Sequence, residues 1–272
     1  MRFDAWSDPG SDTKPNEDWC GSTDSVAVLL DGVTSPAGLE TGCVHGVPWF
    51  VEHLGRELLD VASGDPSVPL QGCLGSAIAR IAALHEVSCD LAHKGTPSAT
   101  VLVIRAHGEM LEYLVLSDST LVLESEDQIR VITDSSLNLV AQEEREWVGK
   151  QPLGSPEHDK AVRALVTKQR SWRNVNGGYW LVAAVPEASS EALTGAVTLR
   201  QLRRGALLSD GASCLVDRYE CCTWKELLDL IDAGGARRVV DEVRKVENAD
   251  KQGELWARYK VSDDSTVLTF KT

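Results

Sequence analysis

The chain lacks the long apolar segments typical of membrane proteins. Its 272 residues contain no 18-residue apolar run, and the first residues, Met1–Asp4, do not lead into the apolar core of a signal peptide. Basic residues are also scarce, since 27 lysines and arginines face 41 aspartates and glutamates, for a net charge of −14. This charge disfavours nonspecific attraction to nucleic acid or to an anionic membrane. We therefore expect a cytoplasmic protein that binds neither nucleic acid nor membrane.

The common spacings of zinc-binding residues are missing as well. The seven cysteines include no C-x-x-C pair, and the six histidines include no H-E-x-x-H motif. Cys73 and Cys89 lie in apolar stretches with a helix-like pattern, which favours reduced core cysteines. The adjacent Cys221 and Cys222 are poorly placed to bind one ion without further ligands. These patterns disfavour a zinc enzyme.

Length and composition allow one large domain or two small ones, because 43% of the residues are hydrophobic. No Pro/Gly/Ser-rich linker, charge block or internal repeat divides the sequence. We therefore expect a single domain over residues 1–272.

Hydrophobic patterns predict the helices and strands. The apolar run 25–30 predicts a buried strand that ends at Asp31-Gly32, and helical spacing over 50–61 and 70–84 predicts two amphipathic helices with a loop at 63–66 between them. Further strands are predicted at 99–105, 111–116, 120–123, 129–132, 179–185, 205–209 and 266–270, and further helices within 143–173, at 227–231 and at 239–246. Short polar separators between the strands from 99 to 132 favour an antiparallel meander.

Acidic residues recur near the ends of the predicted strands. They form four short motifs: Asn16-Glu17-Asp18, Asp31-Gly32, Ser209-Asp210-Gly211 and Asp263-Asp264-Ser265-Thr266. Hard cations such as Mg²⁺ and Mn²⁺ prefer carboxylate oxygens, and an acidic protein can bind phosphate when such ions supply the positive charge. Each motif alone is also a common turn or cap signal. Together they predict a hard-metal site assembled from distant strand ends.

The motifs resemble, in content and in order, those of the metal-dependent serine/threonine protein phosphatases of the type 2C class. Asn16-Glu17-Asp18 resembles the N-E-D motif of that family, Asp31-Gly32 its D-G-x-G-G motif, Ser98-Ala99-Thr100 its G-S-T-A segment, Leu116-Ser117-Asp118-Ser119 its G-D-S-R turn, Leu208-Ser209-Asp210-Gly211 its S-D-G motif, and Asp263-Asp264-Ser265-Thr266 its D-N-x-T motif. The resemblance covers nearly the entire chain. It implies an α+β fold, a four-layer α-β-β-α sandwich of two mainly antiparallel sheets flanked by helices, with a two-metal site at one end.

Position by position, the resemblance also implies the site residues. The implied metal ligands are Asp18, Asp31, the backbone carbonyl of Gly32, Asp210 and Asp263, with Asp118 near a third, weaker metal position. Asp31 would bridge two Mn²⁺ or Mg²⁺ ions, and Asp31 and Asp210 would hold the metal-activated water. Asp264 stands where many members have an asparagine and would orient the metal ligands through hydrogen bonds without binding the metal itself.

Three positions depart from the family pattern. Thr13 stands where the family usually has an arginine that grips the substrate phosphate, and Lys14 beside it is the candidate for phosphate binding, although a lysine lacks the bidentate fork of arginine. Val33 stands where eukaryotic members often have a histidine proposed as general acid. Ser117 and Thr120 replace the glycine and arginine of the G-D-S-R-A pattern. Phosphate binding is therefore predicted to differ from that of the family.

These observations favour a monomeric, metal-dependent phosphatase that acts on phosphoserine or phosphothreonine in proteins. One alternative is a phosphatase of a small phosphorylated metabolite, because residues 143–178 and the phosphate-gripping position diverge. Another is a non-catalytic regulatory module of the same fold, although a module without chemistry has no reason to keep clustered, mutually repelling carboxylates. Trp147 and Trp172, in the divergent stretch, are candidates for substrate or partner contact.

Overall fold

Two antiparallel sheets packed face to face form the centre of the structure, a computed structural model that describes residues 1–126 and 128–272. One five-stranded sheet has the order β1 (Arg2–Asp8), β10 (Ser265–Lys271), β9 (Leu202–Leu208), β6 (Thr120–Ser125) and β7 (Ile129–Ile132). The other has the order β2 (Asp18–Ser22), β3 (Val26–Gly32), β4 (Ala99–His107), β5 (Met110–Leu116) and β8 (Leu193–Thr198).

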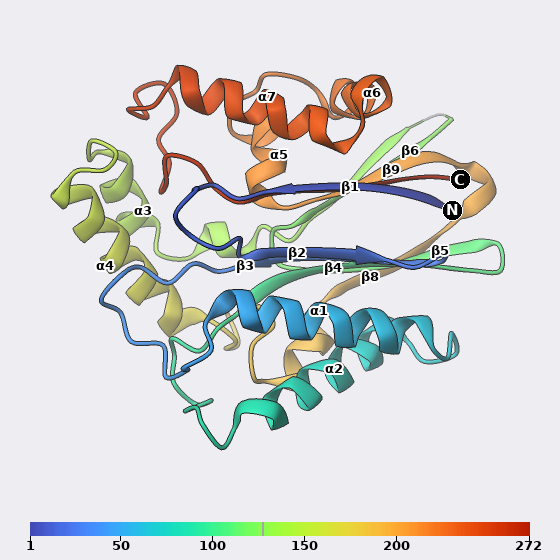
Figure 1. Ribbon diagram of the computed structural model, residues 1–272, viewed down its shortest axis with the longest axis horizontal. Coiled ribbons are helices and arrows are strands. Elements are labelled where there is room, and N and C mark those ends of the chain that lie inside the picture. The colour runs from blue at the N-terminus through green and yellow to red at the C-terminus, as the bar shows by residue number, and fades with distance from the viewer. Residues whose placement is uncertain (127) are drawn as a thin grey trace.

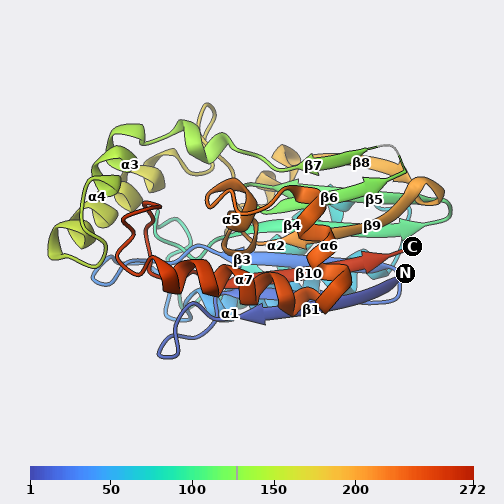
Figure 2. The same cartoon turned by 90° about the horizontal axis from the view of Figure 1, so that it is seen from above.

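Helices cover the outer face of each sheet. The sheet that contains β3 is covered by α1 (Val47–Ser63) and α2 (Leu70–His85), and the sheet that contains β10 by α5 (Asp210–Asp217), α6 (Trp224–Gly234) and α7 (Ala236–Ala249) (Figure 1). The remaining helices, α3 (Gln142–Gly149) and α4 (Pro156–Trp172), lie at one end of the sandwich (Figure 2). Short 3₁₀ turns span Ser136–Leu139, Pro186–Glu191 and Leu199–Gln201. The predicted four-layer α+β sandwich is confirmed.

The continuous apolar runs follow from burial of the central strands on both faces. In β3, Ala27 and Leu29 pack between the two sheets against residues such as Leu268, whereas the alternate residues Val28 and Leu30 pack beneath α1 and α2. Successive side chains of a strand point to opposite faces, so a strand between two apolar layers needs apolar residues at every position. This requirement is why the strand at 25–30 could be predicted from sequence.

The predicted meander is wrong at one junction. β4 pairs with β5 and β6 pairs with β7, but β5 and β6 belong to different sheets. The chain crosses between the sheets at residues 117–119, where Ser117 has a φ of 72°, in the left-handed region. Because β5 and β6 are both largely apolar, their patterns do not reveal which sheet each strand joins.

The strands that the sequence did not predict are β1, β2 and β8, and each is an edge strand of its sheet. Edge strands are exposed along one side and tolerate glycine and polar residues, so they lack a clear hydrophobic pattern. Residues 179–185, which the sequence predicts to be a strand, form two isolated bridges instead, from Val182 to Ala99 and from Tyr179 to Arg173. The neighbouring Leu181 N–H donates instead to the side chain of Asn174 at 2.8 Å.

In the part of the chain that the structure describes, no helix combines the length and the hydrophobicity needed to cross a membrane.

Candidate active site

The hairpin of β2 and β3 places two aspartates opposite each other. Asp18 begins β2, and its direct cross-strand partner is Asp31 near the end of β3. Asp18 is buried, and its Oδ2 accepts a hydrogen bond from Thr266 Oγ1 at 2.7 Å. Its Oδ1 is buried and finds no hydrogen-bond donor among the described residues. An unpaired, buried carboxylate oxygen is costly unless a cation binds it, so this arrangement fits a metal ligand.

Gly32 follows Asp31 in a crowded position. A Cβ atom at this residue would lie 2.3 Å from the carbonyl oxygen of Glu17 and 2.4 Å from Val47 Cγ1. Only glycine therefore allows the end of β3 to approach the N-E-D segment and α1 this closely.

Two further aspartates reach the same end of the sandwich from the C-terminal part of the chain. Asp210 is the first residue of α5, and its backbone N–H donates to Asp31 Oδ2 at 3.1 Å. Asp263 precedes β10, and its Oδ1 accepts from the backbone N–H of Asp264 at 2.9 Å. The side chain of Asp264 in turn accepts from the backbone N–H groups of Gly10 at 2.8 Å and Glu17 at 2.7 Å. Asp264 thus ties the N-E-D segment to the segment that carries Asp263.

Asp118 lies on the crossing between the two sheets and approaches the same cluster. Burial and then the charge of Asp210 raise the pKa of Asp118 to about 7. The crossing itself is fixed by Asp134, whose backbone N–H donates to Ser117 O at 3.1 Å. The structure therefore brings together all five predicted aspartates, although they lie on four separate stretches of the fold.

Burial, together with repulsion between the carboxylates, raises the pKa values in this cluster. Burial, followed by the charges of Asp18, Asp210 and Asp263, raises the pKa of Asp31 well above its ordinary value. Burial, opposed by the hydrogen bond from Thr266 and reinforced by the charge of Asp263, raises the pKa of Asp18 to about 8. Clustered carboxylates of this kind need positive charge to remain ionised at neutral pH, and a divalent cation supplies it. The donor set, made of oxygens alone, fits Mg²⁺ or Mn²⁺.

Lys260 is a residue of this site that the sequence interpretation missed. Its Nζ donates to Asp263 Oδ1 at 2.5 Å and to Thr34 Oγ1 at 2.8 Å. Burial alone would lower the pKa of Lys260. The charges of Asp263, Asp210 and Asp31 outweigh this effect and raise the pKa above its ordinary value, so the ammonium stays protonated. No motif marks this lysine in the sequence, because its role depends on the path of the loop before β10.

Lys14, the predicted phosphate-binding residue, is exposed on the loop between β1 and β2. Within the described part of the chain, no hydrogen bond or ion pair joins the ammonium of Lys14 to the carboxylates, whereas Lys260 makes both with Asp263. Two cavities that share Arg218 are lined by other cations, and the smaller of them also includes carboxylates of the cluster. A cavity of about 20 Å³ is lined by Asp210, Arg218 and Lys260, and one of about 130 Å³ by Arg145, Arg218 and Tyr259. Arg218 therefore faces the space beside the carboxylates.

A buried ion pair fixes the loop that carries Lys260 and Asp263. Arg258 Nη1 lies 2.9 Å from Asp250 Oδ2, and both side chains are almost fully buried. Asp250 also accepts hydrogen bonds from the backbone N–H groups of Glu254 at 2.8 Å and Trp256 at 3.2 Å. The carboxylate of Asp250 thus organises the turn that leads from α7 back to the site.

An Asp250→Asn variant is expected to lose about 2 kcal/mol of stability at pH 7, because Arg258 is left buried without a counter-charge. Burial alone would raise the pKa of Asp250, but the hydrogen bonds from Trp256, Leu255 and Glu254 and from Arg258 outweigh it, and the pKa lies below 3.8. A lowered folded-state pKa adds stability that is fully present above the ordinary value and is lost as the pH falls through the folded-state value.

Thermal unfolding measured from pH 7 down to pH 3 should therefore show a steeper loss of stability in the original chain than in Asp250→Asn. Asp241→Asn, which removes an exposed carboxylate from α7, is the matched control and should leave the profile unchanged. Parallel profiles for Asp250→Asn and the original chain would contradict the assigned role of Asp250.

The chain is similar to known proteins in its structure and not in its sequence. No protein-family model matches the chain, and no curated protein does. Solved structures do match over nearly the full length. The serine/threonine phosphatase Stp1 from Staphylococcus aureus has a TM-score of 0.60 at 14% identity, with 100% of this chain and 95% of that one covered.

Two other structures are similar to the same extent. The catalytic domain of the serine/threonine protein phosphatase PstP, in complex with two manganese ions, has a TM-score of 0.55 at 18% identity, covering 98% of this chain and 96% of that one. PppA, a key regulatory component of T6SS in Pseudomonas aeruginosa, has a TM-score of 0.58 at 15% identity with the same coverage. The chain therefore has the fold of the bacterial type 2C serine/threonine phosphatases, as its ordered motifs predicted.

Proposed function

We propose that residues 1–272 form one monomeric domain that hydrolyses phosphomonoesters with the help of Mn²⁺ or Mg²⁺, and that its substrates are proteins carrying phosphoserine or phosphothreonine. The observation that carries the proposal is the convergence of Asp18, Asp118, Asp210 and Asp263 on Asp31, together with a buried oxygen of Asp18 that has no hydrogen-bond donor among the described residues. The fold of Stp1 and PstP, both serine/threonine phosphatases, supports the same reaction class.

In this proposal, each side chain has a defined task. The metal-binding groups are the carboxylates of Asp18, Asp31, Asp210 and Asp263 and the carbonyl of Gly32, with Asp118 near a third position. Cations bound there would acidify water and neutralise charge on the phosphoryl group. Asp31 and Asp210 hold the attacking water between them. Val33 has no titratable group, so protonation of the leaving alcohol is left to water held at the metal-binding carboxylates.

Phosphate binding is assigned to Arg218 in place of the family arginine. Arg218 lines the small cavity that contains Asp210 and Asp263 and also the neighbouring larger one, and its guanidinium can offer two parallel N–H donors to a phosphate. Lys260 lines the smaller cavity as well and contributes positive charge there. Lys14 is the competing candidate, because it stands next to the position of the missing arginine.

An Arg218→Ala variant is expected to raise the KM for para-nitrophenyl phosphate about tenfold, which corresponds to the loss of one hydrogen bond to a charged group. Its kcat should change much less, since the carboxylates are untouched. Lys14→Ala is the matched comparison, with an expected KM close to that of the original chain. The opposite ranking of the two variants in steady-state kinetics would assign phosphate binding to Lys14.

Protein substrates are supported by the exposed surface at the same end of the molecule. Trp147 on α3 and Trp172 on α4 are 37% and 41% exposed, and large aromatic side chains of this kind favour contact with a macromolecular partner. Arg145, also on α3, donates to Tyr259 at 2.6 Å and so links this surface to the loop of the carboxylate site.

The proposal is tested by turnover of para-nitrophenyl phosphate with Mn²⁺, with Mg²⁺ and after chelation. Turnover should require a divalent cation, and turnover that persists unchanged after chelation would reject the mechanism. A panel of phosphopeptides and small phosphorylated metabolites then identifies the substrate class. Faster hydrolysis of phosphopeptides is expected, and a preference for metabolites would replace protein with metabolite as the substrate.

A regulatory module of the same fold is the second candidate, and the ion pair of Lys260 with Asp263 favours it. This ammonium already neutralises part of the charge that a metal would neutralise. PppA, a regulatory component by its description, shares the fold. Binding of Mn²⁺ without turnover of any substrate on the panel would support this candidate over the enzyme.

A further inference from the structure

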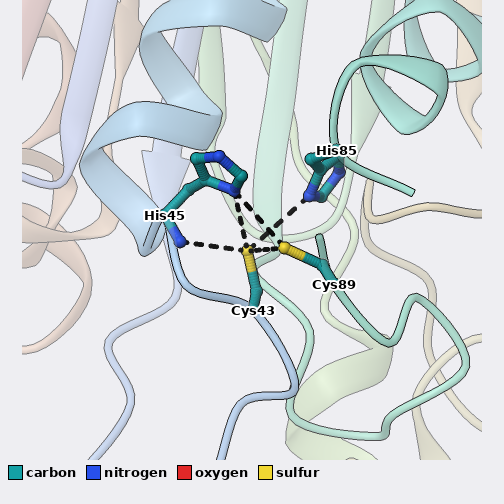
Figure 3. A group of neighbouring side chains, drawn as sticks. All are labelled: Cys43, His45, His85 and Cys89. Atoms are coloured by element: carbon teal, nitrogen blue, oxygen red, sulfur yellow. Dashed lines mark hydrogen bonds between the residues drawn. The ribbon is translucent and has the colours of Figure 1, made fainter. Parts of the chain in front are cut away.

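Two cysteines and two histidines meet at a point outside the carboxylate cluster. Cys43 and His45 lie on the loop between β3 and α1, His85 is the last residue of α2, and Cys89 follows on the next loop. Figure 3 shows these four side chains facing one another, and one ligand atom from each lies within 4.8 Å of all the others.

The distances between the ligand atoms match the edges of a tetrahedron. Cys43 Sγ lies 3.3 Å from Cys89 Sγ and 3.6 Å from His85 Nδ1, and Cys89 Sγ lies 3.4 Å from His45 Nδ1. In a tetrahedral zinc site, Zn–S bonds of about 2.3 Å and Zn–N bonds of about 2.0–2.1 Å give edges of roughly 3.3–3.8 Å. The two sulfurs are too far apart for a disulfide, whose S–S bond is about 2.05 Å.

We propose that this cluster, hereafter the Cys₂His₂ site, binds one Zn²⁺ ion through Cys43, His45, His85 and Cys89. Four protein ligands close the coordination shell, so the ion would be structural and not catalytic. Thiolates and imidazoles suit Zn²⁺, whereas Mg²⁺ and Mn²⁺ prefer oxygen ligands, so the two metal sites differ in ion as well as in place. On binding, the two thiols release their protons to solvent and become thiolate ligands.

His85 is the buried member of the four ligands, at 1% exposure, and its Nδ1 lies 3.6 Å from Cys43 Sγ. An ion bound at Nδ1 would hold the imidazole with its proton on Nε2. Nε2 is buried without a hydrogen-bond partner among the described residues and would gain none from the ion, so the support comes from the position of Nδ1. Trp49 packs against both imidazole rings. Its ring stacks on that of His45 with centroids 4.3 Å apart, and its centroid lies 5.2 Å from that of His85.

The backbone around the cluster already holds its two halves together. Gly42, at a φ of 69°, accepts a hydrogen bond through its carbonyl from the N–H of Asp90 at 2.8 Å. This bond joins the loop of Cys43 to the loop of Cys89, because Gly42 directly precedes Cys43 and Asp90 directly follows Cys89. Ligands held in place before the ion arrives lose less conformational entropy when they bind it.

The sequence contains the two halves of the motif as Cys43-x-His45 and His85-x₃-Cys89, separated by residues 46–84. The interpretation of Cys89 as part of a helical core run is wrong, because α2 ends at His85 and Ser88 N–H turns back to bond His85 O. Helices α1 and α2 occupy the residues between the two halves, so the halves are far apart in the sequence. Only the fold shows that they meet in space.

Metal analysis of the full chain tests the proposal. After purification under reducing conditions with zinc and removal of excess ion, the original chain should retain one zinc, and Cys43→Ser and Cys89→Ser should fall below about 0.1 equivalent. Cys221→Ser, which changes an exposed cysteine elsewhere, is the matched control and should retain the full amount. An original chain that retains no zinc, with or without a disulfide between Cys43 and Cys89, would overturn the proposal.

Cobalt spectroscopy of the original chain removes the dependence on how well the variants fold. Co²⁺ should produce the thiolate charge-transfer and tetrahedral d–d absorption bands, and an equimolar amount of Zn²⁺ should abolish them. Asp210→Asn should show the same bands, which separates this site from the proposed phosphatase site. Bands that are absent, or that persist in Cys43→Ser, would refute the Cys₂His₂ site even if phosphatase activity is confirmed.

Discussion

Asp210→Asn is expected to reduce metal-dependent turnover of para-nitrophenyl phosphate by at least about 100-fold, because the substitution removes a charged oxygen from the proposed metal site. Asp210 is also bonded through its backbone to Asp31, so one residue connects two of the proposed ligands. Asparagine preserves the size of the side chain and leaves this backbone bond in place. The measurement is steady-state turnover over a titration with Mn²⁺.

Stability measurements separate loss of a ligand from loss of structure. Burial, and then the charge of Asp263, raises the pKa of Asp210, so ionising this side chain in the metal-free protein costs more free energy than in water. Removing that charge should leave the melting temperature without metal equal or higher, while the stabilisation by added Mn²⁺ should shrink. Asp217→Asn, at the exposed end of the same helix, should match the original chain in both respects. Normal turnover by Asp210→Asn would remove this residue from the mechanism.

Arg204→Met is expected to cost about 3–5 kcal/mol of stability, the largest effect predicted outside the site. Arg204 is buried in β9, where it pairs with Glu124 of β6, its direct cross-strand neighbour. It also lies 2.6 Å from both Asp229 and Asp232 of α6 and donates to Leu228 O at 2.8 Å. Methionine fills much of the same volume but leaves the buried carboxylate of Glu124 without a partner.

Urea unfolding of a double variant identifies the cause of this loss. Arg204→Met combined with Glu124→Leu should recover a large part of the stability, because replacing the buried pair by apolar residues leaves no buried charge without a partner. Asp229 and Asp232 also lose Arg204, but they are partly exposed and keep Lys225 and Lys271 as partners. Arg203→Met, at the exposed neighbouring position on β9, should change stability by less than about 0.5 kcal/mol. If Arg204→Met resembles Arg203→Met, the network contributes little to stability.

The sequence allowed the fold and the acidic half of the site to be predicted, because both depend on short local patterns. Asp31-Gly32 follows an apolar strand, and Asp210 separates a strand from a helix, so each position could be placed on an element. The pairing of Asp18 with Asp31 could not be predicted, since β2 is an edge strand without a hydrophobic pattern. Family order, and not periodicity, indicated that Asp18 belongs to the site.

The cationic half of the site could not be predicted for a different reason. Arg218 and Lys260 lie just after a helix and on a loop, where neither spacing nor burial pattern distinguishes them from other surface cations. Their positions depend on the turn that Asp250 organises and on the packing of α5 against α7. The resemblance indicates Lys14 because it aligns positions along the chain, whereas the proposal of Arg218 rests on the cavities that this side chain lines, and the KM values of the two variants decide between them.

The position of β10 determines when this protein can fold during synthesis. β10 is the last strand of the chain, yet it lies inside its sheet, between β9 and the first strand, β1. Until the ribosome has produced residues 265–271, β1 has no partner and the two sheets cannot close over their shared core. The sandwich therefore remains incompletely folded until residues 265–271 have been made, and the acidic cluster cannot be complete before then, because Asp263 and Thr266 come with this strand.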